Sequence, residues 1–443
     1  MTETLPPGLS PATVHSPVSR LPRPSASAPS AAGLTAGGLT TGRGAALYIG
    51  ALLGPGLLLL PGLAAAEAGP ASVLAWAGLL VLSGLFAVVF GALGRGFPSA
   101  GGVVGYVRAG LGARASAVAG WSFLAGVVAG APVVCLIGAG YVTQLTGGGT
   151  LARALIAAAL LLAVMALAAG GLQASATAQL LLVGLLIGVV VIAVSGSARW
   201  SHAANWTPFA PHGWQAVGHA AATLMLSFVG WEAVAPLTTR FTDPTRQLPR
   251  VIGTALVVTS VLYLGLAIAA ISVLGNGAGI SAPLAALLGD AAGPAGAAAA
   301  AVAAVVLTLG SVNAYVTGAV ELTRSRGAGT GQARRPAPGL LTAIALSGLA
   351  LISLYGLGLA SPAALVALPT TLFLVVYLGC MTSAARVLRG PARWAAVPAA
   401  VVVAVILAYC GWALLAPLAV ILAVCLARPL ARAVRPARGR ADG

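Results

Sequence analysis

Side chains suited to acid–base or ligand chemistry are scarce in this chain of 443 residues, which has only seven carboxylates. Six of them lie near the termini, in predicted loops or at the ends of apolar runs, where solvation or an ion pair accounts for them: Glu3, Glu67, Asp243, Asp290, Glu321 and Asp442. Glu232 instead follows Gly230 within an apolar run. In a membrane-spanning helix an unpaired charge there costs about 2.5–3.5 kcal/mol, so Glu232 needs a partner or a function.

Three interpretations of Glu232 remain open. The carboxylate could accept hydrogen bonds from nearby backbone N–H groups, take up and release a proton, or bind the amino group of a ligand. The cysteines and histidines suggest no other chemistry, because the four cysteines lie in apolar runs without CxxC spacing and the four histidines are scattered. We therefore expect no catalytic residues, no disulfides and no metal site.

Two apolar runs are interrupted near their centres by residues that disfavour helix. Break 1 spans residues 53–56 and contains Gly54-Pro55-Gly56, and break 2 spans residues 228–231 and contains Gly230. Proline lacks an N–H group and clashes with the preceding turn, and glycine adds backbone freedom. Because lipid cannot hydrogen-bond the freed backbone groups, such breaks are stable in a membrane only where they face protein, water or a ligand.

The composition indicates an integral membrane protein. The chain is 59% hydrophobic and 7% charged, with a mean hydropathy of +1.01, which leaves too few polar groups to cover a soluble protein of this size. Its apolar segments have the length of about 20 residues that a helix needs to cross a bilayer. The alternating patterns of a β-barrel are absent from the sequence. We predict an all-α membrane protein.

Twelve membrane-spanning helices are expected, over residues 44–66, 71–93, 117–143, 151–170, 176–195, 216–238, 251–274, 292–322, 339–358, 362–385, 394–411 and 413–428. All 23 basic residues are arginines, and 21 of them share one side if the N-terminus is cytoplasmic. This follows the positive-inside rule, so both termini are expected in the cytoplasm, at a bacterial-type plasma membrane. The net charge of +16 is thereby explained without nucleic acid.

The breaks also predict the domain organisation. They lie in the first and sixth spans, so residues of about 44–195 and about 216–385 are expected to form a 5+5 inverted repeat with discontinuous helices 1 and 6. Two extra helices follow at about 394–428. The transmembrane domain, 43–428, is flanked by a disordered tail of Pro, Ser, Ala and Thr over 1–42 and by a basic tail over 429–443.

A substrate site at the two breaks is the functional prediction. In transporters with inverted repeats, the N-termini of half-helices bind anionic groups and freed carbonyls bind cations, which suits an amino acid. In the eighth span Asn313 shares a face with Thr317 while Tyr315 points elsewhere; interhelical hydrogen bonding or contact with the transport path explains the pair. The predicted substrate-binding residues are Leu53, Gly54, Pro55, Gly56, Phe228, Val229, Gly230, Trp231 and Asn313, with Glu232 as a coupling or structural carboxylate.

These motifs resemble the amino acid–polyamine–organocation superfamily of secondary transporters, over residues of about 42–428. The resemblance rests on break 1, on Phe228-Val-Gly230-Trp231-Glu232, and on the inner loop Asp243-Pro244-Thr-Arg246-Gln-Leu-Pro249-Arg250, which resembles a capped turn. Gly94 to Val103 and Ser311 to Tyr315 look most like the bacterial exporters of L-methionine and branched-chain amino acids. The resemblance implies alternating access, efflux of apolar amino acids by an antiport coupled to a proton gradient, and no bound cofactor.

The chain departs from the superfamily pattern at two places. Some proton-coupled relatives place a lysine in the fifth span, and this chain has no lysine. Many relatives carry acidic residues soon after the sixth-span break, where this chain has Pro236 to Arg240. The alternatives are an importer of amino acids or amines with the same fold, a passive channel, or an intramembrane enzyme, for which the spans lack clustered acids or an HExxH motif. The oligomeric state is not predicted.

Overall fold

The structure is a computed structural model, and it describes residues 40–54, 56–97, 102–170, 176–231, 241, 243–280, 282–326 and 338–433. Nearly all of these residues are helical, which confirms the predicted all-α fold. Most of the predicted N-terminal tail, Pro55, Glu232 and residues 434–443 lie outside the described residues.

The described helices follow one another with short connections. In chain order they are α1 (Thr41–Leu52), α2 (Gly56–Ala68), η1 (Gly69–Ala71), α3 (Ser72–Gly96), α4 (Val103–Thr146), α5 (Thr150–Ala169), α6 (Ala176–Ser197), η2 (Ala198–Trp200), η3 (Ala203–Trp206), α7 (Gln215–Leu224), η4 (Met225–Phe228), α9 (Pro244–Ala269), the π-helical η6 (Ala270–Leu274), η7 (Gly275–Gly279), α10 (Pro283–Arg326), α11 (Pro338–Gly356), α12 (Pro362–Val387), α13 (Pro391–Ala408), η8 (Gly411–Leu414) and α14 (Leu415–Ala433).

Two helix starts illustrate how the sequence sets these boundaries. The Asp243 carboxylate accepts hydrogen bonds from the N–H groups of Thr245 and Arg246, both at 3.2 Å, and caps α9 as the sequence predicts. Ser361 caps α12 in the same way, through the N–H of Ala364 at 3.1 Å. In each case a proline follows the cap at the first helical position, where its missing N–H costs no hydrogen bond.

The helices next to the breaks are each too short to cross a membrane alone. At 1.5 Å per residue, α1, α2 and α7 are each shorter than a bilayer core of about 30 Å. Within the described residues, nine helical segments are long and apolar enough to cross a membrane, and the first of these joins α2 to α3. The predicted number of twelve spans therefore stays a prediction.

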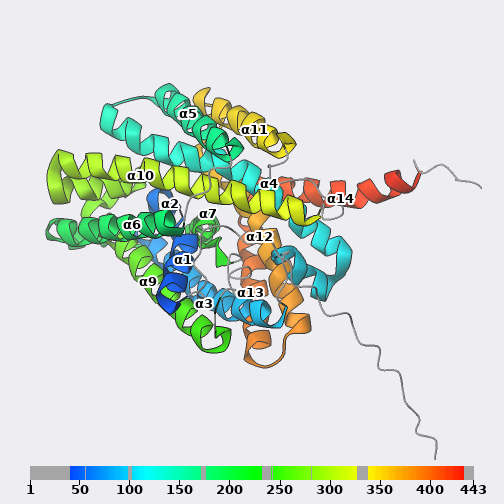
Figure 1. Cartoon of the computed structure of the whole chain (residues 1–443). Coiled ribbons are helices and arrows are strands. Elements are labelled where there is room, and N and C mark those ends of the chain that lie inside the picture. Colours follow the sequence, from blue (N-terminus) through cyan, green and yellow to red (C-terminus); the bar gives the residue numbers. More distant parts are fainter. Residues whose placement is uncertain are drawn as a thin grey trace, which may run out of the picture. The chain divides into compact units, whose positions relative to one another are not determined.

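The longest helices are α4 and α10, which pack against each other (Figure 1). Each has 44 residues and is kinked near its start at a glycine with positive φ, Gly112 in α4 and Gly293 in α10. They correspond to the third and eighth predicted spans, which an inverted repeat would pair. The shared kink favours the predicted repeat.

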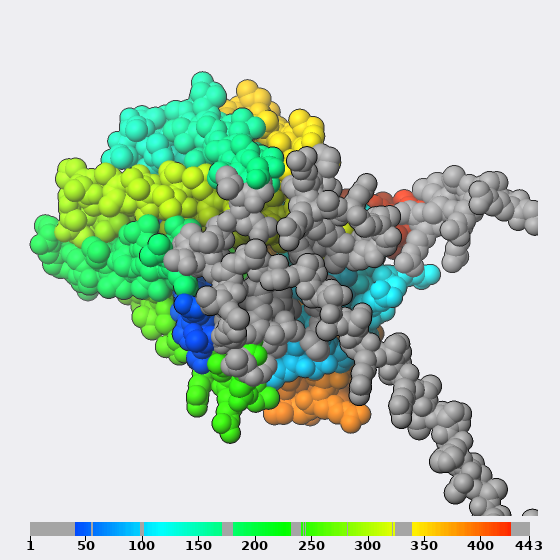
Figure 2. All heavy atoms as spheres, in the orientation of Figure 1, coloured from blue at the N-terminus to red at the C-terminus, as the bar shows by residue number. Residues whose placement is uncertain are grey.

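The half-helices are enclosed by longer ones. The helix α2 packs on α7, α1 packs on α9 and α6, and α12 packs on α4 and α13. Outward-facing positions carry apolar side chains, such as Leu155 of α5, Leu181 of α6 and Val302 of α10. Figure 2 shows α5, α10 and α6 as successive bands of surface. This arrangement places lipid-compatible side chains outside and the breaks inside.

Candidate functional site

Break 1 is an interruption between two helices rather than a bend in one. Leu53 leaves the helical region (φ −78°, ψ 67°), and its N–H bonds the carbonyl of Ile49 at 2.7 Å. The N–H of Leu57, in the first turn of α2, bonds the carbonyl of Gly54 at 3.2 Å. Among the described residues, none accepts a hydrogen bond from the N–H of Gly56 or Leu58. Within the described part of the chain, these two donors at the N-terminus of α2 are therefore unused.

Break 2 begins where α7 tightens into the 3-10 helix η4. Val229 is extended (φ −74°, ψ 128°), and Gly230 has a φ of +147°. This positive φ favours glycine because a side chain would clash with its own backbone. Trp231 is the last residue before the undescribed segment 232–240.

The two breaks touch each other through backbone. A Cβ on Gly230 would run into the carbonyl of Ala51, whose carbon would lie 2.9 Å away. A Cβ on Gly56 would lie 2.7 Å from Oγ of Ser227 and 3.3 Å from its Cα. Glycine at both positions is what allows α1, α2 and η4 to approach so closely.

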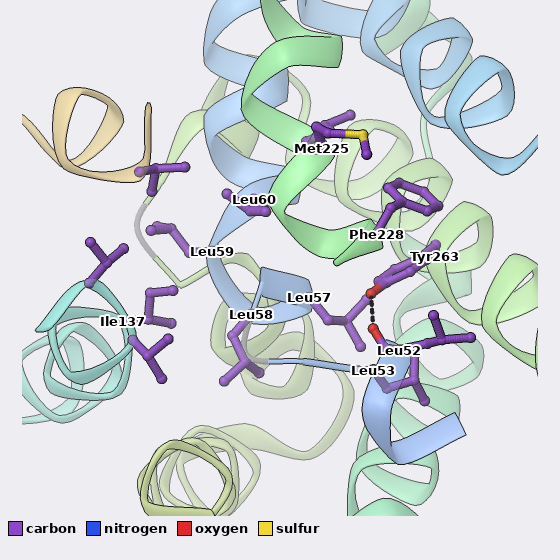
Figure 3. Packing of buried hydrophobic residues seen from close by; sticks show 14 of the residues in the cluster. Leu52, Leu53, Leu57, Leu58, Leu59, Leu60, Ile137, Met225, Phe228 and Tyr263 are labelled. Carbon is purple, nitrogen blue, oxygen red and sulfur yellow. Dashed lines mark hydrogen bonds between the residues drawn. The ribbon is translucent and has the colours of Figure 1, made fainter. Parts of the chain in front are cut away.

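A single tyrosine hydroxyl joins the residues that immediately precede the two breaks, Leu52 and Ser227. Tyr263 of α9 lies with its Oη 2.7 Å from the carbonyl oxygen of Leu52 and 2.8 Å from that of Ser227. Figure 3 shows its ring between the end of α1 and the η4 residues, with the bond to Leu52 dashed. The side chain is 1% exposed. The two carbonyls thus share one hydroxyl proton, and the Leu52 carbonyl also accepts the N–H of Gly54 at 2.9 Å.

Two further buried tyrosines hold the breaks from other helices. The hydroxyl oxygen of Tyr377, on α12, accepts hydrogen bonds from the N–H groups of Gly230 at 3.1 Å and Trp231 at 3.2 Å. The hydroxyl of Tyr141, on α4, donates to the carbonyl of Leu58 at 2.8 Å. Three tyrosines from three helices therefore supply backbone partners that lipid could not.

The apolar side chains of break 2 are packed in different directions. Phe228 forms an aromatic cluster with Trp76 and Tyr263, with ring centroids 5.9 and 5.4 Å away. The Trp231 indole donates to Oγ of Ser83, on α3, at 2.8 Å. Val229 packs instead in a small cluster with residues of α4, α10 and α12, including Phe373.

On α10, Tyr315 approaches break 1 more closely than the sequence predicts. The Cβ position of Gly54 would lie 3.8 Å from the Tyr315 hydroxyl oxygen. Asn313 is buried on a neighbouring face, one turn after Gly310, whose Cβ position meets Leu182 of α6. The Oδ1 of Asn313 has no hydrogen-bond partner among the described residues. Its assignment to the substrate site stays a prediction.

Among the carboxylates, Glu232 lies outside the described residues, so its three interpretations stay open. Glu67, expected to be solvated, is instead half-buried at the end of α2, and its Oε1 accepts the hydroxyl of Thr223 at 2.8 Å. The expectation was wrong because α7 folds back alongside α2 and places Thr223 next to it. Sequence spacing alone does not reveal that contact.

The bridging tyrosines were also missed from the sequence. Only eight tyrosines occur in the chain, and Tyr141, Tyr263 and Tyr377 lie within predicted apolar spans. A tyrosine hydroxyl at such a depth needs a hydrogen-bond partner, and freed backbone at a break provides one. That requirement is the signal by which they could have been found.

The two breaks face each other with helix ends of opposite partial charge. The first-turn N–H groups of α2 carry the positive end of its helix dipole, and α7 and η4 approach break 2 with their C-terminal, negative end. The side chains of Leu53, Phe228, Val229 and Trp231 at the breaks are apolar, and each of them is at most 4% exposed. The arrangement suits a small zwitterion with an apolar side chain.

Comparison with known proteins agrees with this chemistry. Residues 39–327 match the family described as amino acid permease. The chain is 31% identical over 388 residues to the uncharacterized amino acid permease YecA of Bacillus subtilis, which covers 85% of this chain and 91% of the relative. It is 28% identical over 384 residues to the L-methionine/branched-chain amino acid exporter YjeH of Escherichia coli, covering 84% and 91%.

A solved structure shares the fold at low sequence identity. MhsT, crystallised in complex with L-phenylalanine, superposes with a TM-score of 0.60 over 86% of this chain and 98% of its own. The two sequences are 15% identical. MhsT has the leucine-transporter fold, so this likeness places the described helices in that fold.

Proposed function

We propose, on the premise that the chain belongs to the amino acid permease family, that it exports apolar amino acids across the plasma membrane by alternating access around breaks 1 and 2. Membership makes it a multi-pass membrane transporter of amino acids. The single observation that carries the mechanism is the meeting of two interrupted helices at the Tyr263 hydroxyl. Interrupted helices at mid-membrane depth form the substrate sites of inverted-repeat transporters.

The proposed binding mode follows the direction of the backbone groups. The substrate carboxylate binds the free N–H groups of Gly56 and Leu58 at the start of α2. The ammonium group binds carbonyls at the C-terminal end of α7 and η4. The side chain is apolar because the described residues of both breaks carry no charged side chain. Methionine, leucine, isoleucine and valine fit this description.

The direction of transport is proposed as export, supported by similarity to the exporter YjeH over most of both chains. Reconstituted protein should exchange labelled L-leucine and L-methionine, and cells that lack the protein should accumulate these amino acids. Lower intracellular levels in cells lacking the protein would instead indicate import. Equilibration without accumulation under every imposed ion gradient would indicate a passive channel.

Coupling to a proton gradient is proposed with Glu232 as the candidate group. Proteoliposomes with imposed proton and sodium gradients test the coupling ion directly. Glu232→Gln should abolish the response to the proton gradient while substrate exchange at equal pH persists. If the response to the proton gradient survives in Glu232→Gln, Glu232 is not the coupling site, and the structural role remains.

A further inference from the structure

A cavity of about 280 Å³ lies at the far end of the half-helices that form the breaks. It is lined by the end of α2, by α7, by the first turns of α12 and by the connection from α13 to η8. Glu67 in its wall is eleven residues beyond Gly56, or about 16 Å along the axis of α2. The cavity therefore shares two helices with the breaks but is separate from them.

One wall of this cavity carries a carboxylate, Glu67, that forms no ion pair among the described residues. The Oε1 of Glu67 accepts the Thr223 hydroxyl, while its enclosed Oε2 has no hydrogen-bond partner among the described residues. Burying an ionised oxygen without a partner is costly. A ligand ammonium would supply the missing positive charge. His219, at the same wall, is exposed and stacks edge-on against Tyr409 at 5.3 Å.

Another part of the wall is the N-terminus of α12. Ser361 caps the N–H of Ala364, whereas the N–H of Ala363 has no partner among the described residues. The positive end of this 26-residue helix attracts a carboxylate. Between the two charged ends, Tyr409 and Trp412 give the cavity an aromatic wall. The volume is near the lower limit of small-molecule sites, on the scale of one amino acid.

We propose that this cavity is a second binding site for an amino acid zwitterion, occupied between the breaks and the side of the membrane predicted to be outside. The ammonium group lies at Glu67, the carboxylate at the start of α12, and the side chain against Tyr409 and Trp412. This inference rests on the proposed function in that the ligand is the transported substrate. The Glu67–Thr223 bond links α2 to α7, so occupancy of the cavity is coupled to the half-helices that must move.

Ligand binding in the cavity can be measured through the reactivity of Cys410, without a transport assay. Its thiol lines the cavity and is partly buried, Cys135 and Cys380 are buried, and Cys425 is exposed. In a Cys425→Ser background, small methanethiosulfonate reagents will therefore report on Cys410. The full-length protein is reconstituted in lipid nanodiscs, and the modification rate of Cys410 is measured with an ethylammonium and an ethylsulfonate reagent.

The ethylammonium reagent should react at least about fivefold faster than the ethylsulfonate reagent, because one nearby charge changes local ion concentration by roughly that factor. Glu67→Gln should remove the preference, and Glu67→Asp should retain it. Asp290→Asn, which removes an exposed carboxylate outside the cavity, is the matched control and should retain it as well. L-leucine should slow the modification saturably, and N-acetyl-leucine, which lacks the ammonium, should not.

Gly56→Leu separates this site from the proposed function. If the cavity binds independently, L-leucine still protects Cys410 in Gly56→Leu, even though transport is lost. Protection that disappears in Gly56→Leu, or that persists unchanged in Glu67→Gln, would overturn the second site. Failure of both reagents to reach Cys410 would overturn it too, since a ligand-sized cavity must admit them. Protection without any transport by the unmodified protein would refute only the proposed function.

Discussion

Breaks 1 and 2 are both stabilised by buried tyrosines, but the tyrosines bind different sets of backbone groups. At break 1, Tyr263 and Tyr141 donate to the carbonyls of Leu52 and Leu58. At break 2, the Tyr377 hydroxyl accepts hydrogen bonds from the N–H groups of Gly230 and Trp231 and donates to the carbonyl of Phe228 at 3.4 Å. The tyrosine hydrogen bonds of the described residues therefore go to carbonyls at break 1 and to both N–H groups and a carbonyl at break 2.

The remaining groups give each break its own character. At break 1 the N–H groups of Gly56 and Leu58, at the positive end of α2, have no partner among the residues that the structure describes. At break 2 the N–H groups of Gly230 and Trp231 are engaged, and the carbonyls of Ser227 and Phe228 accept tyrosine hydroxyls. The position of a helix break therefore does not by itself show whether the break binds an anionic or a cationic group. The hydrogen-bond partners of its backbone groups must be known as well.

The largest expected effect comes from closing the gap at break 1. Gly56→Leu would drive a side chain into Ser227, which lies 2.7 Å from the position of the new Cβ. We expect exchange of labelled L-leucine in proteoliposomes to fall on the order of 100-fold, because displaced binding groups cost about that much. Gly78→Leu, at an exposed position on α3 with open space around it, should exchange normally. Normal flux in Gly56→Leu would remove break 1 from the mechanism.

The corresponding change at break 2 is Gly230→Ala. A side chain at a φ of +147° is strained by about 1–3 kcal/mol, and here it also meets the backbone of Ala51. We expect a lower thermal unfolding midpoint together with a loss of exchange. Gly112 also has a positive φ, but a Cβ there would meet no other atom. Gly112→Ala therefore shows the effect of backbone strain without the steric clash. Equal effects of the two variants would mean that contact between the breaks is unimportant.

A smaller effect is expected from removing the hydroxyl that joins the breaks. Tyr263→Phe leaves buried carbonyls of Leu52 and Ser227 without this donor, at a cost of about 1–3 kcal/mol in the free energy of unfolding. Denaturant unfolding in detergent and L-leucine exchange measure the two consequences. Tyr106→Phe is matched, because the buried Tyr106 hydroxyl has no partner among the described residues, and this variant should be neutral or stabilising. A neutral Tyr263→Phe would contradict the joining role.

The smallest effect concerns the start of α9, the helix that carries Tyr263. Hydrogen bonds from the Thr245 side chain and the Arg246 N–H lower the pKa of Asp243 below its ordinary 3.8. The resulting stabilisation is fully present above pH of about 3.8 and is lost as the pH falls through the lower folded pKa. Asp243→Ala should lower the thermal midpoint slightly at pH 7 and remove this acid sensitivity. Asp290→Ala should leave the acid dependence unchanged.

Composition and residue type predict much of this fold. Apolar segments of bilayer length and the arginine distribution lead to a helical membrane protein, and Gly54, Pro55, Gly56 and Gly230 mark the breaks. These signals are local, because proline and glycine change the backbone wherever they occur. The break positions in the structure match those in the sequence at Leu53 and Val229.

Contacts between distant residues could not be predicted in this way. Arg153, near the start of α5, is buried, with its Nε donating to the carbonyl of Leu136 at 3.0 Å and its guanidinium over the Tyr355 ring. Its partners are a backbone carbonyl and an aromatic face, which no charge pattern reveals. Tyr263 likewise lies 211 residues from Leu52, so their bond depends on how α1 and α9 pack.

The Tyr263 hydroxyl has one proton and two acceptors, the carbonyls of Leu52 and Ser227, at nearly equal distances. At any instant it donates to one of the two carbonyls; the Leu52 carbonyl also accepts the N–H of Gly54 at 2.9 Å. Rotation about the Cζ–Oη bond exchanges the two without moving the ring. The junction between the half-helices therefore has two hydrogen arrangements for one set of heavy-atom positions.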